Sequence, residues 1–300
     1  MSGPYENSRL RPAMQEYLEI EGRDRLYQCW DRIFVHTDDT KAAFLALQDC
    51  MNAPPNTKPR GVVIVGDSDT GKSRTMVAFR DANKPAPDPD YEYAEHPVIY
   101  VKAPDDPNPV ILLRKILDEI KYPINYNAQP AIVRSHTVRM LRHCRVGTVM
   151  IDEFRDLGNE RMTAKLIDFF VFLKNLINEV ERPFVVGGTR SVVDMIASDA
   201  QLAGRLDQKI ELRPFKIAQF VKVLLAFELM LPLRKASNFR EDERLIQALF
   251  TLSSGYIGRL NVLLYDACQV AIESGEERIT LSTIDRVKGR SIKPLGRHAA

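Results

Sequence analysis

The sequence has no long hydrophobic run, few cysteines and almost no net charge. Its longest apolar cluster, Leu166 to Leu173, is interrupted by Asp168, so no segment approaches the length of a membrane span. The stretch Met1 to Leu10 lacks the apolar core of a secretory signal, and we expect a cytoplasmic protein with no membrane partner. The four cysteines show no paired metal-ligand spacing, which predicts reduced, structural thiols. A net charge of +2 neither requires nor excludes a nucleic-acid partner.

A phosphate-binding loop is the strongest motif present. The run Gly66-Asp67-Ser68-Asp69-Thr70-Gly71-Lys72-Ser73 follows the apolar stretch Val62 to Val65 and matches the pattern Gly, four free positions, Gly-Lys-Ser/Thr. Its glycines let backbone N–H groups turn toward a phosphate, while Lys72 can reach the β- and γ-phosphates and the Ser73 hydroxyl can bind Mg²⁺. We therefore predict that residues 66–73 and the adjoining Arg74 bind ATP with Mg²⁺. Asp67 and Asp69 depart from the usual small or neutral residues, and the charge of Asp69 would oppose a triphosphate unless it turns outward.

Short apolar runs alternate with helical patterns, which predicts an α/β fold with a parallel sheet and crossover helices. After Leu212-Arg213-Pro214 the chain looks helical up to about residue 288. We expect an extension and helix (1–55), an α/β ATPase domain (56–213), a helical lid domain (214–290) and a basic tail (291–300). The expected strands are 61–65, 98–102, 148–151 and 183–187; the expected helices are 38–51, 74–80, 109–120, 131–142, 164–179 and 191–197.

A second part of the nucleotide site is predicted at Val149-Met150-Ile151-Asp152-Glu153, a buried strand that ends in two carboxylates. Ligands of open α/β sheets bind at the carboxyl ends of strands, so both acids should lie beside the phosphate loop. Asp152 would hold Mg²⁺, directly or through water. Glu153 would activate the water that attacks the γ-phosphate, which favours hydrolysis over transfer to a metabolite.

Three further residues are candidates for contacts with the γ-phosphate. Thr189 follows the strand Phe184 to Gly187 and would sense the phosphate from between Glu153 and the loop, although it could simply cap the next helix. Arg205 could reach the nucleotide of a neighbouring subunit. Arg259, at a helix start in the helical region, could touch the nucleotide from the lid side. A plain surface salt bridge is the alternative for both arginines.

Taken in order, these motifs resemble an AAA+ ATPase: a P-loop NTPase parallel sheet with flanking helices, followed by a small all-helical lid. The resemblance covers residues from about 36 to 290. The sequences Val186-Gly187-Gly188-Thr189-Arg190 and Gln201-Leu202-Ala203-Gly204-Arg205-Leu206 are similar to the TniB/TnsC family of transposition regulators. So are residues 33–36 and 97–104, and the chain looks most like TniB.

The resemblance implies an ATP-dependent, DNA-binding regulator of DNA transposition in bacteria, associated with the nucleoid. Such a protein assembles with itself as a ring or helical filament on double-stranded DNA and recruits a TniA-like DDE transposase. A TniQ-type adaptor is a further partner. ATP binding would favour the assembly and hydrolysis would dismantle it. Because Arg205 would act on a neighbour's nucleotide, ATPase activity should depend on oligomerisation.

DNA contacts in this family come from the segment after the second strand and from nearby helix starts. We expect contacts to the phosphate backbone, with affinity that falls steeply with salt and varies little with sequence. The candidates here are Lys102, Arg114, Lys115, Lys121, Arg139 and Arg142.

Other functions remain open from the sequence. One is a nucleotide-stabilised DNA scaffold in which hydrolysis is slow or incidental. Another is a helicase-loader or initiator-type AAA+ ATPase, although no winged-helix or helix-turn-helix module is recognisable after the lid. A metabolic kinase is least favoured, because it would leave Arg205 and Arg259 unexplained. The first 35 residues and the basic tail are candidate partner contacts.

Overall fold

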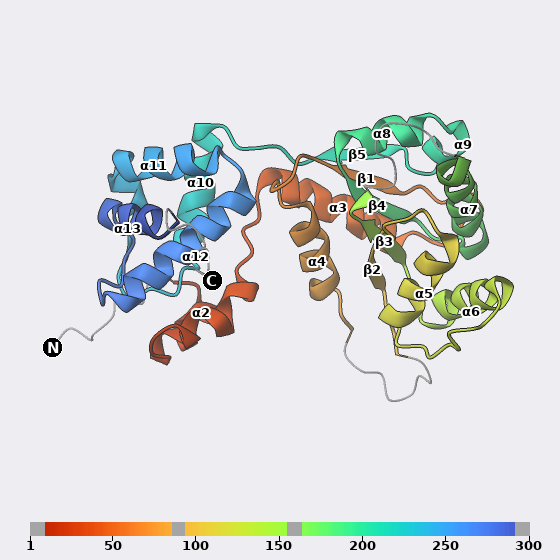
Figure 1. Ribbon diagram of the computed structural model, residues 1–300, viewed down its shortest axis with the longest axis horizontal. Coiled ribbons are helices and arrows are strands. Elements are labelled where there is room, and N and C mark those ends of the chain that lie inside the picture. Colours follow the sequence, from red (N-terminus) through yellow and green to blue (C-terminus); the bar gives the residue numbers. More distant parts are fainter. Residues whose placement is uncertain (1–9, 86–93, 155–163, 292–300) are drawn as a thin grey trace, which may run out of the picture. The chain divides into compact units, whose positions relative to one another are not determined.

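The computed structural model describes residues 10–85, 94–154 and 164–291. They form two compact units, one of residues 38–213 and the other of the residues up to Thr37 together with those from Pro214 onward (Figure 1). The basic tail beyond residue 291 lies outside the described residues. In the part of the chain that is described, no helix is long and apolar enough to cross a membrane.

The unit of residues 38–213 is built on a five-stranded parallel sheet with the strand order β2-β3-β4-β1-β5. This confirms the predicted α/β fold. Runs of β-branched residues suit strands that are buried on both faces, as β1 is along its whole length. The strands are β1 Val62–Val65, β2 Val98–Lys102, β3 Thr148–Asp152, β4 Phe184–Gly188 and β5 Gln208–Glu211.

Helices cover both faces of this sheet. Val62 and Ile64 of β1 belong to a buried cluster with α3 and α4, whereas Val63 and Val65 belong to a second one with α5, α6 and α7. Alternate side chains of a strand point to opposite faces, so the two clusters are the two layers of the unit's core. The helices are α3 Asp38–Asn52, α4 Lys72–Ala82, α5 Pro109–Glu119, α6 Pro130–His143, α7 Ala164–Val180, α8 Arg190–Ala197 and α9 Ala200–Ala203.

Strand β5 is absent from the sequence-based expectation. Its residues Gln208-Lys209-Ile210-Glu211 are half-buried or exposed, and they pair with β1 only. An edge strand of this kind needs no apolar run, because solvent covers part of its surface. Its position matters for the site, since Glu211 pairs in register with Val65, the residue before the phosphate loop.

The second unit is helical, as the sequence predicted for its carboxyl-terminal part. The domain boundary expected near residue 55 differs from the structure, where helix α3 belongs to the sheet unit and the residues before Asp38 belong to the helical one. The reason is apolar burial: Met14, Leu26 and Ile33 lie in one buried cluster with the carboxyl-terminal helices. The helices are α1 Pro12–Gln15, α2 Asp24–Cys29, α10 Ile217–Glu228, α11 Glu243–Ser253, α12 Ile257–Glu273 and α13 Leu281–Ser291, with short 3-10 turns at Glu16–Glu19, Trp30–Arg32 and Phe239–Glu241.

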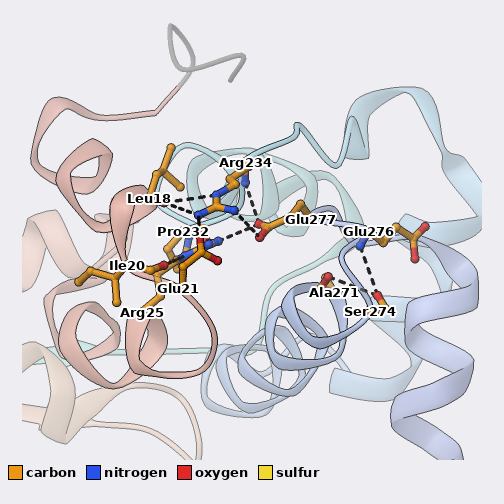
Figure 2. Close-up of polar contacts among 10 residues, drawn as sticks. All are labelled: Leu18, Ile20, Glu21, Arg25, Pro232, Arg234, Ala271, Ser274, Glu276 and Glu277. Carbon is orange, nitrogen blue, oxygen red and sulfur yellow. Dashed lines mark hydrogen bonds and ion pairs between the residues drawn. The ribbon is translucent and has the colours of Figure 1, made fainter. Parts of the chain in front are cut away.

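A buried ion pair joins the two segments of the helical unit (Figure 2). Arg25 of α2 is fully buried, and its Nη1 donates to Glu277 Oε2 at 2.7 Å and to the Pro232 carbonyl oxygen at 3.1 Å. Arg234 donates to the Leu18 carbonyl oxygen at 3.0 Å and lies beside the same Glu277 carboxylate. The amino-terminal segment is therefore held to the carboxyl-terminal helices by polar contacts as well as by apolar packing.

Candidate nucleotide site

The phosphate loop joins β1 to α4 through backbone conformations that its residue types allow. Asp69 and Gly71 have φ angles of 65° and 91°, in the left-handed region. Aspartate enters this region more readily than most residues, so Asp69 can occupy a position where glycine is common. A Cβ atom on Gly66 would lie 2.4 Å from the Leu212 carbonyl oxygen, and only glycine fits there. Asp67, Ser68 and Asp69 are all exposed.

The Lys72 ammonium group lies over this loop. Its Nζ donates to the carbonyl oxygens of Gly66 at 2.8 Å and of Asp67 at 2.7 Å, and the Thr70 hydroxyl also donates to the Asp67 carbonyl at 2.8 Å. Ser73 is exposed in the first turn of α4, where helix N-termini attract anions. Arg74 beside it is half-buried. The loop thus presents a cation, a hydroxyl and a helix N-terminus at one place.

Asp152 ends β3 as a buried carboxylate with an exposed fraction of 1%. Its Oδ2 accepts a hydrogen bond from the Tyr100 hydroxyl at 2.8 Å, and its Oδ1 accepts one from the Glu153 backbone N–H at 2.8 Å. Burial, and then the Asp152 charge, raise the pKa of the Tyr100 hydroxyl, so that it stays protonated as a donor. Gly187 makes room for the carboxylate, because a Cβ there would lie 2.7 Å from Oδ1.

Glu153 directly follows this strand in a left-handed conformation, with φ of 57°. Such a backbone costs a non-glycine residue about 1–2 kcal/mol, and residues of this kind concentrate at functional sites. Its Oε1 lies 2.9 Å from the Lys102 Nζ atom, and the two side chains are 41% and 58% exposed. Surface pairs of this kind contribute about 0–1 kcal/mol, so another ligand can displace either partner.

Thr189 lies between these two parts of the site. Strand β4, which it follows, stands between β3 and β1 in the sheet, so its carboxyl end separates Glu153 from the phosphate loop. Its hydroxyl is 2.8 Å from the Ser191 hydroxyl and does not cap α8 through a side-chain bond to the backbone. Its role in sensing the γ-phosphate stays a prediction.

The residues present fit Mg²⁺ bound together with a nucleotide. Among the described residues, no cluster of three or more His, Cys, Asp or Glu side chains is arranged to hold a metal ion. Mg²⁺ is usually held by one or two protein oxygens together with phosphates and water. The Ser73 hydroxyl and the Asp152 carboxylate are oxygen donors of this kind, at the carboxyl ends of β1 and β3.

Comparison with known proteins agrees with this geometry. The family model "Bacterial TniB protein" matches residues 25–217. The chain belongs to the TniB family. No curated protein sequence matches it. Among solved structures, this TniB-family chain is similar to Aeropyrum pernix ORC2 in its ADPNP–ADP complexes, with 17% identity and a TM-score of 0.57, over 84% of this chain and 66% of that one.

Two other solved structures have the same fold. Aeropyrum pernix ORC1 in complex with DNA has 15% identity and a TM-score of 0.59, over 86% of this chain and 66% of that one. Cdc6p from Pyrobaculum aerophilum has 13% identity and a TM-score of 0.60, over 88% and 70%. The TniB-family chain therefore spans about two thirds of the length of the ORC proteins. These similarities establish the fold of an AAA+ P-loop ATPase.

In this TniB-family chain, Arg205 lies near the amino end of β1, whereas the phosphate loop lies at its carboxyl end. Its carbonyl oxygen accepts a hydrogen bond from the N–H of Gly61, which precedes β1, whereas the loop follows β1. The four residues of that strand span about 13 Å at 3.3 Å each. The guanidinium group is half-buried, and its Nε donates to Asn178 Oδ1 at 2.9 Å. Arg205 is thus placed away from its own loop.

Arg259 lies in α12, in the helical unit. It is exposed in the first turn of that helix, and its guanidinium carbon lies 4.4 Å from the centroid of the Tyr256 ring. Stacking on an aromatic face orients a guanidinium group without neutralising its charge. Contact with a nucleotide stays a prediction for this residue.

The six candidate DNA contacts come from β2, from α5 and the segment just after it, and from α6. Lys102 and Lys115 are close together at the carboxyl end of β2, where the Lys115 Nζ donates to the Lys102 and Ala103 carbonyl oxygens at 3.1 Å. Arg142 is at the end of α6, near the amino ends of the strands, and it donates to the Glu179 carbonyl oxygen at 2.7 Å.

The other three candidates lie on or just after α5 and on α6. Arg114 donates to the Tyr126 carbonyl oxygen at 2.7 Å and lies over that residue's ring, so it supports the loop after α5. Lys121 follows α5 in a left-handed conformation, and Arg139 is exposed on α6. Of the six, only Lys102 lies directly against a predicted catalytic residue.

Sequence reasoning missed Tyr100, the hydrogen-bond partner of Asp152, and it named Lys102 only as a DNA contact, not as the ion-pair partner of Glu153. Tyr100 and Lys102 occupy alternate positions of β2, and β2 pairs in register with β3 so that Lys102 lies opposite Asp152. The period-2 rule puts both β2 side chains on the face that carries Asp152. That pattern would have identified them once β2 was known to neighbour β3.

Proposed function

We propose that the protein is an ATP-dependent, DNA-binding regulator of transposition that assembles on double-stranded DNA and recruits a DDE transposase. The observation that carries the ATPase part is the joint placement of Lys72, Asp152 and Glu153 at the carboxyl edge of one parallel sheet. Membership of the TniB family supports the role in transposition. The ORC1 structure in complex with DNA shows that a protein of this fold binds DNA.

Each side chain of the site has its own role in ATP hydrolysis. Lys72 binds the β- and γ-phosphates, while Ser73 and Asp152 hold Mg²⁺, which would neutralise charge on the phosphates. Glu153 accepts a proton from the attacking water, and Thr189 orients the γ-phosphate from its position between the two strands. To act as a base, the Glu153 carboxylate turns from Lys102 toward that water. Release costs little because both side chains are exposed to solvent over about half of their surface.

Assembly completes the site. Arg205 lies about the length of β1 from its own loop, so it can contact a γ-phosphate only in a neighbouring subunit. An arginine supplied in this way typically contributes about 10³–10⁵ in rate. Turnover is therefore low in the monomer and rises when subunits gather on DNA. Hydrolysis removes the γ-phosphate that joins two subunits and dismantles the assembly.

Replacement of Glu153 by Gln tests this function. ATP hydrolysis should fall about 10²–10⁴-fold, since a general base is lost, while DNA-bound assemblies seen by electron microscopy persist. Target regulation in a transposition assay should fail. The matched control is Glu181→Gln: Glu181 also has a left-handed backbone, with φ of 59°, but it follows α7 and precedes β4. It should leave all three readouts unchanged.

The same experiment separates the regulator from its alternatives. Unimpaired target regulation by Glu153→Gln would indicate a scaffold in which hydrolysis is incidental. If Glu153→Gln hydrolyses ATP at the wild-type rate, Glu153 is not the general base. A wild-type protein that hydrolyses ATP at full rate as a dilute monomer without DNA would contradict the role of the neighbouring subunit.

A further inference from the structure

The Tyr100 side chain crosses from β2 to the end of β3. Tyr100 pairs in register with Met150, so its ring extends diagonally to reach Asp152, two residues further along. The hydroxyl donates to Asp152 Oδ2 at 2.8 Å. A phenol donor at this distance from a buried carboxyl group makes a well-formed hydrogen bond, which is costly to lose in the protein interior.

The ring that carries this hydroxyl is held from the helix side. The Arg80 guanidinium carbon of α4 lies 5.6 Å from its centroid. Arg80 is in turn fixed by ion pairs with Asp81 at 2.9 Å and with Glu119 at 3.6 Å. Two elements that flank β2 thus set the direction of the phenol, so the hydroxyl position does not depend on Asp152 alone.

The other side of the Asp152 carboxylate is equally constrained. Oδ1 accepts the Glu153 backbone N–H at 2.8 Å and faces the space left by the missing side chain of Gly187. With one donor on each oxygen, the carboxylate plane is fixed. Each carboxylate oxygen has two lone pairs, so both oxygens keep acceptor capacity for a metal-bound water.

We propose that Tyr100 is a positioning residue that orients Asp152 toward the Mg²⁺ of the bound nucleotide. The inference rests on the proposed function, because it needs Asp152 to hold that ion. Groups that hydrogen-bond to a metal's ligands fix the ligand's orientation, and their removal typically weakens metal binding about 10–100-fold. Tyr100 itself touches neither metal nor nucleotide.

The test is Tyr100→Phe, which removes the hydroxyl and keeps the ring against Arg80. Binding of Mn²⁺ in place of Mg²⁺, with saturating ADP present, is measured by electron paramagnetic resonance of the free ion. We expect about 10-fold weaker Mn²⁺ binding, with ADP binding in the absence of metal unchanged. The matched control is Tyr122→Phe, since the Tyr122 hydroxyl makes a hydrogen bond of the same length, 2.8 Å, to His136 Nδ1 elsewhere in the unit.

Two further variants decide how a result is interpreted. If Tyr100 acts through Asp152, the double variant Tyr100→Phe, Asp152→Asn binds Mn²⁺ as weakly as Asp152→Asn alone. Additive losses, or unchanged Mn²⁺ binding in Tyr100→Phe while Asp152→Asn is impaired, would overturn the inference and leave the proposed function standing. Unimpaired Mn²⁺ binding in Asp152→Asn would instead overturn the metal site of the proposed function. A thermal melt of each variant shows whether a loss reflects unfolding.

Discussion

The sheet unit and the helical unit are built from the chain in different ways. The sheet unit is one continuous stretch, residues 38–213, whereas the helical unit combines the residues up to Thr37 with those from Pro214 onward. The first contains the phosphate loop and the Asp152–Glu153 pair, where local sequence patterns indicate both fold and site. The second is joined by contacts between distant residues, and among the ion pairs of the described residues Arg25 with Glu277 is the most buried. Changes in the sheet unit's site should therefore act on function, and changes at this ion pair on stability.

The largest expected effect belongs to Arg205, in the sheet unit. Arg205→Ala should lower the ATPase rate of DNA-bound assemblies by about 10³-fold or more, because the neighbour's γ-phosphate loses its cation. The comparison variant is Asn178→Ala, which removes the hydrogen-bond partner of Arg205 and keeps the guanidinium group. It should retain the rate.

Steady-state ATP hydrolysis, with and without duplex DNA, measures both variants of this pair. If the arginine only braces α7, the two substitutions will behave alike. A loss in Arg205→Ala that is equal in dilute protein without DNA would also contradict action between subunits.

The second-largest expected effect is a loss of folding stability in the helical unit. Glu277→Gln leaves the Arg25 charge buried without its closest carboxylate, which typically costs about 3–5 kcal/mol. The surface pair of Arg23 with Glu273 joins the same two segments, so Glu273→Gln is the matched control and should cost less than about 1 kcal/mol.

Amide hydrogen exchange shows which unit loses stability, and we expect it to be the helical unit. Amides of α2 should exchange faster in Glu277→Gln, while those of β1 and β4 in the sheet unit keep their protection. Equal effects from Glu277→Gln and Glu273→Gln would show that apolar packing alone holds the amino-terminal segment.

The same contrast explains how much the sequence predicts. The phosphate loop and the strands β1 to β4 follow from apolar runs and residue spacing, because parallel strands are buried on both faces. Strand β5 lacks such a run, and the partner of residues 14–33 is more than 180 residues away along the chain. No local pattern specifies the contact of Arg25 with Glu277 or of Tyr100 with Asp152. Both depend on which elements become neighbours.

The smallest effect is expected at Lys102, a predicted DNA contact that pairs with the predicted catalytic residue Glu153. Its ammonium group is 58% exposed and pairs with Glu153, so a DNA phosphate can compete for it at a cost of about 1 kcal/mol or less. Lys102→Gln should weaken DNA binding modestly and uniformly across sequences. The slope of log affinity against log salt should fall by about 0.9, the value for one phosphate contact.

Lys115→Gln is the control for this prediction, because the Lys115 ammonium group already donates to two backbone carbonyls. Fluorescence anisotropy with duplex DNA at several salt concentrations gives both slopes. An unchanged slope in Lys102→Gln would assign this lysine to Glu153 alone. A reduced slope, with basal hydrolysis altered in the same variant, would mean that DNA and the catalytic carboxylate share one cation, so that binding of DNA frees Glu153 for the attacking water.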